Sequence, residues 1–180
     1  MPSGSRGRYL QVSSRTLPRI DPRGTEDPMR NPWLLTAVIG MTCVLAGTAL
    51  AQPDGAAVYL RCFGCHTATG DGIPGTYPPL AGHAAELLKA DRAYPVKVVL
   101  YGLAGEIEVG GKKYNGKMPG FGDQLKDDEV SALLNYILSR WGNEKMLPKG
   151  HKEFTPAEVK TQRAKKLTGE QVRGARPRLK

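Results

Sequence analysis

The sequence predicts a mainly α-helical domain that carries one small β-hairpin and ends in a helical extension. Apolar residues recur at i, i+3, i+4 and i+7 in two segments, 96–103 and 130–137, which is the spacing of a helix with one buried face. Residues 106–115 instead flank a Gly-Gly pair that is typical of a tight hairpin turn. Two helix-start signals follow within residues 155–171.

The charge of the chain is concentrated at its carboxyl end. The 180 residues carry a formal net charge of +9, which by itself would suit nucleic acid or an anionic membrane. Residues 145–180 hold eleven Lys/Arg and three Asp/Glu, a net charge of +8, whereas residues 52–144 hold nine and eleven, a net charge of −2. Because the basicity belongs to a tail and the sequence has no RNA- or DNA-binding motif, we expect no nucleic-acid partner.

The amino-terminal part of the chain predicts a targeting segment outside the folded domain. Residues 1–28 are rich in Ser, Arg, Pro and Gly and predict disorder; translation from Met29 would leave them out of the protein. Residues 29–51 combine an Arg, a long apolar run and a final Ala-Leu-Ala, the pattern of a secretory signal peptide. An uncleaved anchor is the alternative, because residues 33–51 are just long enough to span a membrane. We expect cleavage, so that Gln52 begins the mature protein.

We expect residues 52–142 to form the folded domain. Four helices are expected in it. Asp54 is a suitable N-cap for the first helix, and three acidic residues at 127–129 favour the start of the last one through the helix dipole. Gly142 is typical of a helix end, and the Gly- and Pro-rich segment 70–79 predicts a loop. The expected helices cover residues 55–62, 84–90, 94–103 and 127–141.

A hairpin is expected between the third and fourth of these helices. Gly110-Gly111 supplies the two-residue turn, since the favoured hairpin turns need positive φ at their central positions. The register that follows pairs Val109 with Lys112, Glu108 with Lys113 and Ile107 with Tyr114, which are favourable cross-strand neighbours.

Residues 143–180, the carboxyl extension, predict helices rather than a disordered basic arm. Residues 155–158, Thr-Pro-Ala-Glu, form a capping box with proline at the first helical position, so a helix should continue to about Leu167. A second capping signal begins at Thr168. Short helices need an apolar surface to pack on, so we expect the extension to wrap the domain. The side chains expected to dock are Phe154, Val159 and Leu167.

Residues 62–66 read Cys-Phe-Gly-Cys-His, the attachment signature of a c-type haem. Two thiols at this spacing can add to the two vinyl groups of one porphyrin, and the histidine that follows can ligate the iron. A thioredoxin-like pair would need a βαβ context, and a zinc site would need about two more ligands at similar spacing. The sequence has neither. We therefore expect one haem c bound through Cys62 and Cys65, with His66 as an axial ligand.

The second axial ligand separates the possible functions, and four candidates are open. Met118 lies in a Gly- and Pro-containing loop 52 residues after His66, and such a loop can cover the far face of the ring. His83 follows His66 by only 17 residues, which favours the same face as His66. Met146 and His151 lie in the carboxyl extension. These positions favour Met118.

Taken together, these segments resemble class I cytochrome c over residues 52–175. The resemblance is carried by Tyr59, the motif 62–66, Tyr77-Pro78-Pro79-Leu80-Ala81-Gly82, Tyr114-Asn115-Gly116-Lys117-Met118-Pro119 and Leu134-Asn135-Tyr136-Ile137. Further segments are similar to the soluble cytochromes c of extreme thermophiles, which donate electrons to a B-type haem–copper terminal oxidase. These segments are 72–75, 105–109, 154–159 and 163–168.

The resemblance implies a class I cytochrome c fold with axial ligation by His66 and Met118. It also implies that the carbonyl of Pro78 accepts a hydrogen bond from Nδ1–H of His66, a contact that would orient the imidazole. Finally, it implies that the first helix crosses the last core helix near Gly55.

The function implied by the resemblance is outer-sphere electron transfer, not enzyme catalysis. Met/His ligation leaves no open position for a substrate, and the methionine raises the reduction potential. We expect a monomeric periplasmic monohaem carrier between a quinol:cytochrome c reductase and the copper domain of a terminal oxidase. The alternatives are an electron-accepting subunit of a periplasmic dehydrogenase and a haem enzyme with an open sixth site. The expected pocket walls are Leu80, Val99, Leu100, Leu103 and Phe121.

Overall fold

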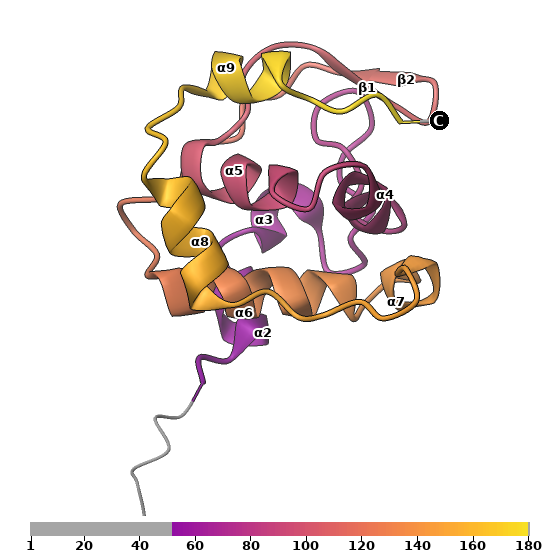
Figure 1. The fold of residues 1–180 in the computed structure, drawn as a ribbon. Helices are drawn as coiled ribbons and strands as arrows, with labels where there is room; N and C mark the ends of the chain where they lie inside the picture. Colours follow the sequence, from indigo (N-terminus) through magenta and orange to yellow (C-terminus); the bar gives the residue numbers. More distant parts are fainter. Residues whose placement is uncertain (1–51, 180) are drawn as a thin grey trace, which may run out of the picture. The chain divides into compact units, whose positions relative to one another are not determined.

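The computed structural model describes residues 52–179, which form eight helices and one two-stranded antiparallel hairpin (Figure 1). The mainly helical fold class with a small hairpin is therefore confirmed. The predicted signal peptide at 29–51 and the preceding segment 1–28 lie outside the described residues. In the described part of the chain, no helix combines the length and the apolar character needed to cross a membrane.

The helices of the core follow the predicted order. They are α2 (Gly55–Tyr59), α3 (Phe63–His66), α4 (His83–Ala90), α5 (Tyr94–Tyr101) and α6 (Asp127–Leu138). The carboxyl extension adds α7 (Asn143–Met146), α8 (Pro156–Arg163) and α9 (Gly169–Gly174). The two strands of the hairpin are β1 (Ile107–Val109) and β2 (Lys112–Tyr114).

Two predicted helices differ from those observed. The single helix expected over 55–62 is divided into α2 and α3 by a turn, and only the second piece carries the end of the cysteine motif. The helix α6 ends at Leu138, three residues before Trp141, which takes a positive φ of 55°. In that conformation the Trp141 indole N–H donates to the carbonyl of Ala68 at 3.0 Å and the ring packs against Tyr59.

The helices α2 and α6 cross in close contact at Gly55, as the resemblance implied. Asp54 caps α2 by accepting a hydrogen bond from the Ala56 backbone N–H at 2.9 Å. A Cβ at Gly55 would collide with the carbonyl oxygen of Ala132 and would lie 2.7 Å from Cβ of Tyr136. Only glycine therefore permits this backbone approach, which anchors the short segment that leads into the cysteine motif.

Gly55→Ala is expected to reduce the free energy of unfolding by about 1–3 kcal/mol, the usual cost of overpacking. The neighbour is backbone of α6, so relief requires the two helices to move apart. Denaturant unfolding of the haem-loaded protein measures the change. Gly174→Ala is the matched control, because a Cβ there meets nothing within 4 Å and the change should be neutral or stabilising. Equal stability of the two variants would contradict the close crossing.

The hydrophobic core has two parts. The main part gathers buried side chains from α2, α4, α5, α6 and α8, such as Val58, Leu88 and Val159. A smaller cluster joins α5, the hairpin and α9 through Tyr94, Ile107 and Val172. The carboxyl extension therefore contributes to both parts.

The hairpin has the predicted register, with Ile107 opposite Tyr114, Glu108 opposite Lys113 and Val109 opposite Lys112. Both turn glycines have positive φ, as the turn type requires. The charged contact differs from the expected one, since Lys113 pairs diagonally with Glu106 at 2.9 Å.

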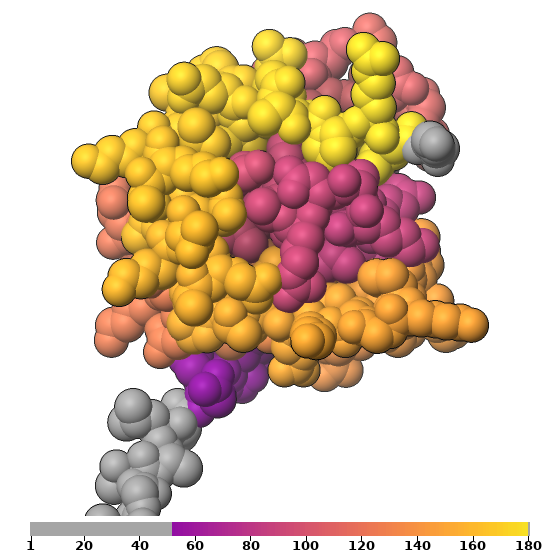
Figure 2. Space-filling view, viewed as in Figure 1, coloured from indigo at the N-terminus to yellow at the C-terminus, as the bar shows by residue number. Residues whose placement is uncertain are grey.

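The carboxyl extension lies across α5 and α6 (Figures 1 and 2). Of the side chains expected to dock, Phe154 and Val159 are buried in the main core, and Leu167 is half-buried against the smaller cluster. Both predicted capping boxes, at Thr155 and Thr168, are present. The carboxyl extension is therefore packed onto the domain.

Polar contacts hold α8 in place on the domain. The Tyr101 hydroxyl donates to the carbonyl oxygen of Gln162 at 2.7 Å or of Arg163 at 2.8 Å. Arg163 pairs with Asp127 at 2.7 Å and donates to the Leu125 carbonyl at 2.8 Å. These contacts join α8 to the ends of α5 and α6.

The helix α7 was not predicted, and it places one buried amide beside the domain. Asn143 is fully buried; its side chain donates to the carbonyls of Leu80 and Ile137, both at 3.1 Å. The side-chain oxygen of Asn143, Oδ1, accepts from the Ala85 backbone N–H at 3.2 Å. Asn143 therefore ties α6 to α4 and to the loop of Leu80.

Candidate functional site

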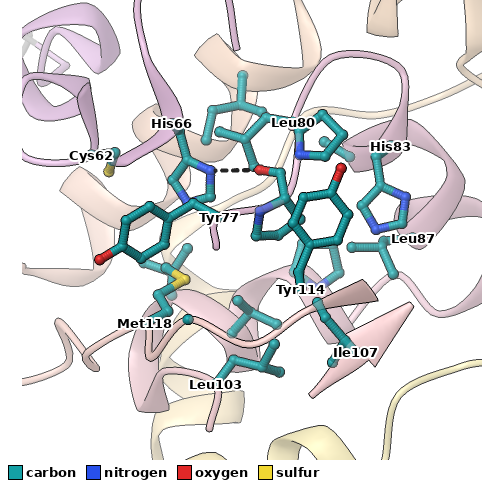
Figure 3. Close-up of a pocket in the computed structure, with 18 of the residues that line it drawn as sticks. Cys62, His66, Tyr77, Leu80, His83, Leu87, Leu103, Ile107, Tyr114 and Met118 are labelled. Carbon is teal, nitrogen blue, oxygen red and sulfur yellow. Dashed lines mark hydrogen bonds between the residues drawn. The ribbon is translucent and has the colours of Figure 1, made fainter. Parts of the chain in front are cut away.

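A cavity of about 110 Å³ opens between α3, α4, α5, α6 and the hairpin, and we call it the central cavity (Figure 3). Four of the five predicted wall residues line it, namely Leu80, Val99, Leu103 and Phe121. The prediction for Leu100 was wrong. Successive helical residues point about 100° apart, and Leu100 is buried in the main core instead.

The cysteine motif lies at one edge of the central cavity. Cys62 and His66 line the cavity, whereas Cys65 is half-buried and is not among the lining residues. The two cysteines are not joined to each other in a disulfide. Before haem is attached, burial, with a smaller effect from Cys65, raises the pKa of the Cys62 thiol to about 11. The Cys65 thiol lies near Tyr77, whose hydroxyl pKa it raises.

His66 is oriented by the hydrogen bond that the resemblance implied. Its Nδ1 lies 3.1 Å from the carbonyl oxygen of Pro78 (dashed line in Figure 3). A carbonyl can only accept, so Nδ1 carries the proton and Nε2 keeps a lone pair that can bind a metal. Burial lowers the pKa of His66, and the bond to Pro78 partly opposes this shift. The imidazole is therefore neutral and preoriented, as a metal ligand requires.

Met118 is held at the cavity by a backbone bridge to Leu103. The two residues exchange backbone hydrogen bonds of 3.0 Å in both directions. Gly102 has a φ of +76°, and a Cβ there would collide with the carbonyl oxygen of Met118. The loop therefore depends on glycine at this position to approach the end of α5. In Figure 3, Met118 is drawn below His66, with the thioether sulfur inside the cavity.

The other three candidate ligands are placed differently. His83 lines the cavity, but its Nδ1 contacts Glu86 at 3.0 Å and its Nε2 contacts Arg176 at 2.9 Å. Met146 packs near Gly82 and His151 lies in the loop after α7, and neither lines the cavity. Met118 is thus the candidate that reaches the cavity with an uncommitted donor atom.

The donor set of the cavity fits a haem. It offers one imidazole nitrogen, one thioether sulfur and a Cys-x-x-Cys pair at an edge, inside walls that are otherwise mostly apolar. Nitrogen and sulfur donors of this kind ligate haem iron in electron-transfer proteins. Within residues 52–179, no group of three or more His, Cys, Asp or Glu side chains could hold another metal ion.

One lining residue was missed by sequence reasoning. Arg176 comes from the segment after α9 and reaches the central cavity beside His83. The two residues are 93 positions apart, and the basic tail around Arg176 reads as a solvated charged segment. No local pattern distinguishes this arginine from its neighbours.

Comparisons with known proteins agree with this geometry. The profile of the family described as "Cytochrome c" matches residues 53–141. The chain is 55% identical over 138 residues to cytochrome c-552 of Thermus thermophilus, a match that covers 76% of this chain and 92% of that protein. It is 32% identical over 106 residues to the cytochrome c subunit of a Gluconobacter oxydans alcohol dehydrogenase (quinone), covering 58% of this chain and 22% of that protein.

Proposed function

Because the chain belongs to the cytochrome c family and carries covalently bound haem c, we propose that it transfers single electrons from a quinol:cytochrome c reductase to a terminal oxidase. The observation that carries this proposal is the placement of His66 and Met118 in one cavity. With both axial positions filled, substrate has no coordination site, which favours a carrier over an enzyme. When bound, haem c supplies reversible one-electron chemistry.

Each motif residue has a distinct part in this proposal. Cys62 and Cys65 would hold the porphyrin through thioether bonds. His66 would ligate the iron through Nε2, while the carbonyl of Pro78 keeps the imidazole in its tautomer and orientation. Met118 would supply the opposite ligand and favour the ferrous state. The apolar walls act in the same direction, because low polarity disfavours the additional positive charge of the ferric state.

Exposed apolar side chains near the cysteine motif support partner docking there. Leu60, Phe63 and Ile73 are 72%, 49% and 40% exposed, the large hydrophobic side chains that stand out on the described surface. In the sequence, Leu60 precedes Cys62, Phe63 lies between the two cysteines and Ile73 follows them in the next loop. The porphyrin edge would be closest to solvent near the two cysteines. A small apolar patch suits a weak, short-lived encounter, as electron transfer between carriers requires.

The proposal is tested by mixing the reduced protein with the purified copper domain of a terminal oxidase and following electron transfer by stopped flow. We expect rapid transfer with a modest dependence on ionic strength, because the side chains proposed to dock are apolar. Leu60→Ser combined with Ile73→Ser should lower the second-order rate constant several-fold.

Lys165→Ser is the control for that experiment, since Lys165 is an exposed charge of the carboxyl extension. It should leave the rate constant almost unchanged. A steep loss of rate with salt, together with a large effect of Lys165→Ser, would assign docking to the basic extension instead.

A second candidate function rests on the similarity to the dehydrogenase subunit. The chain could be the electron-accepting partner of a periplasmic dehydrogenase, although it spans 22% of that relative. Reduction rates with a purified quinol:cytochrome c reductase and with a quinone-dependent dehydrogenase separate the two. Faster reduction by the dehydrogenase would favour the second candidate.

We also propose that the protein works in the periplasm or at the outer face of the cytoplasmic membrane, as a monomer. The support is the signal-peptide pattern at 29–51 and the covalent attachment of haem c, which occurs outside the bacterial cytoplasm.

A further inference from the structure

A second cavity, of about 520 Å³, lies between the end of α4 and the loop that joins α7 to α8, and we call it the basic cleft. Figure 2 shows the orange stretch after α7 against the magenta region of α4 and α5. The basic cleft shares no lining residue with the central cavity, so it is separate from the proposed haem site. Four cations and two carboxylates line it, a net charge of +2: Lys89, Arg92, Lys149, Lys152, Glu153 and Glu158.

The carboxylate of Glu158 is committed to partners inside the protein. Its Oε1 accepts from Nε of Arg92 at 2.7 Å, and its Oε2 accepts from Nη2 of Arg92 at 3.3 Å. The backbone N–H and the hydroxyl of Thr155 also donate to Oε2, at 2.9 Å and 3.1 Å. The hydrogen bond from Arg92 lowers the pKa of Glu158, so this group is ionised at pH 7 and balances the Arg92 charge.

The three lysines of the basic cleft have no matching anion among residues 52–179. None of them forms an ion pair within 4.0 Å in this part of the chain. Lys89 belongs to α4, while Lys149 and Lys152 belong to the facing loop, so like charges line both walls. Like charges repel one another, and a bound anion would offset their repulsion. The remaining carboxylate, that of Glu153, is exposed.

Arg92 offers further donors at the same place. Its hydrogen bonds to residues 52–179 use Nε, which contacts Glu158, and Nη2, which contacts Glu158 and the backbone carbonyl of Glu153 at 3.0 Å. The two N–H groups of Nη1 therefore have no acceptor among these residues. The guanidinium also lies over the Phe154 ring, 4.4 Å from its centroid, which restricts its orientation. A guanidinium that is held in place and has unused donors suits an oxyanion.

We propose that the basic cleft binds a doubly charged oxyanion of the phosphate type. Lysine ammonium groups bind phosphate as point charges, and a guanidinium donates to its oxygens. The cleft is larger than a single phosphate group, so the anion can belong to a phosphate ester. One wall comes from residues 148–158, which lie beyond residues 53–141, the segment that the family profile covers. The site is therefore an addition to the common domain.

His151 makes the binding depend on pH, because its side chain also lines the cleft. Burial lowers the pKa of His151; the Arg92 charge adds to this effect, and the charges of Glu153 and Glu158 oppose it. A bound dianion favours the charged imidazole and raises this pKa, so binding takes up a proton. The affinity should therefore rise as pH falls through the range in which His151 titrates. The other charged groups at the cleft are Lys89, Lys149 and Lys152.

The test titrates sulfate into the ferrous, haem-loaded protein at constant ionic strength and follows the backbone amides of residues 149–152 by NMR. Sulfate is a phosphate mimic that stays doubly charged between pH 5 and pH 8, so its own protonation does not affect the result. Lys89→Gln combined with Lys149→Gln removes one cation from each wall and should weaken binding roughly tenfold or more. Lys145→Gln combined with Lys160→Gln removes the same charge from exposed sites outside the cleft and should change the affinity little.

The variant His151→Asn gives a second measurement. In the unchanged protein, the affinity for sulfate should rise several-fold from pH 8 to pH 5, and His151→Asn should remove most of this rise. Equal dissociation constants for the two double variants would overturn the proposal, and so would an absence of shifts at residues 149–152. The substituted side chains are exposed or half-buried, so the variants should fold, and thermal unfolding without sulfate checks this.

A second experiment identifies the source of the phosphate group. Pyrophosphate is the soluble probe, and vesicles of phosphatidylglycerol, compared with phosphatidylcholine, present a phosphate headgroup. Vesicle binding that is lost in the cleft variant but kept in the control assigns the cleft to a lipid headgroup. Pyrophosphate binding that depends on the cleft lysines, with vesicle binding that does not, assigns it to a soluble phosphate. Neither result needs an electron partner, so failure to reduce an oxidase would refute the proposed function alone.

Discussion

Met118→Ala is expected to leave haem c covalently attached and to lower the reduction potential by an amount on the order of 0.1 V or more, since axial ligands set haem potentials over about 0.8 V. As the proposed ligand, the thioether sulfur would stabilise ferrous iron, and its removal would open a position for water or added ligands. The backbone at Met118 is held by Leu103, so the substitution should change the side chain without releasing the loop. Potentiometric titration and cyanide binding to the ferric protein measure both effects.

Met146→Ala is the matched control, because Met146 packs near Gly82 outside the central cavity. It should retain the native spectrum, the native potential and the resistance to added ligands. A Met118→Ala protein that behaves like the native one would refute the ligand assignment. Loss of the native spectrum in Met146→Ala would then identify the alternative ligand.

Truncation after Gly142 is expected to lower the melting temperature by about 10 °C or more. It removes Phe154, Val159 and Val172 from two hydrophobic clusters. Each large apolar side chain contributes roughly 1.5–3 kcal/mol on burial, part of which is offset by the entropy of ordering the chain. One kcal/mol corresponds to about 4–8 °C for a domain of 60–100 residues. Calorimetry of the haem-loaded proteins measures the difference.

Single substitutions refine the same prediction. Phe154→Ala should cost about 3–5 kcal/mol, because the ring is buried in the main core. Lys160→Ala, in the exposed surface of α8, should cost less than about 0.5 kcal/mol. Electron transfer should change less than stability. An unchanged melting temperature after truncation would show that the extension does not stabilise the domain.

Features that depend on neighbouring residues were predictable from the sequence. Gly110-Gly111 determines the hairpin register, because the turn type and the side-chain alternation leave one pairing. Thr155 and Thr168 mark the starts of α8 and α9, since a capping box uses residues only three positions apart. The Cys-x-x-Cys-His motif likewise brings its two thiols and its imidazole together by spacing alone.

Features that depend on distant residues were decided only by the tertiary structure. Periodicity shows which helical face is buried but not what it packs against, so Leu100 was wrongly placed in the cavity wall. Trp141 is outside the helix, and its indole N–H donates to the carbonyl of Ala68, 73 residues earlier in the chain. Arg176 meets His83 because α9 packs on α5 and the hairpin, and that packing brings a tail arginine to the cavity. Such contacts follow from the summed packing of whole elements, which no local pattern in the chain encodes.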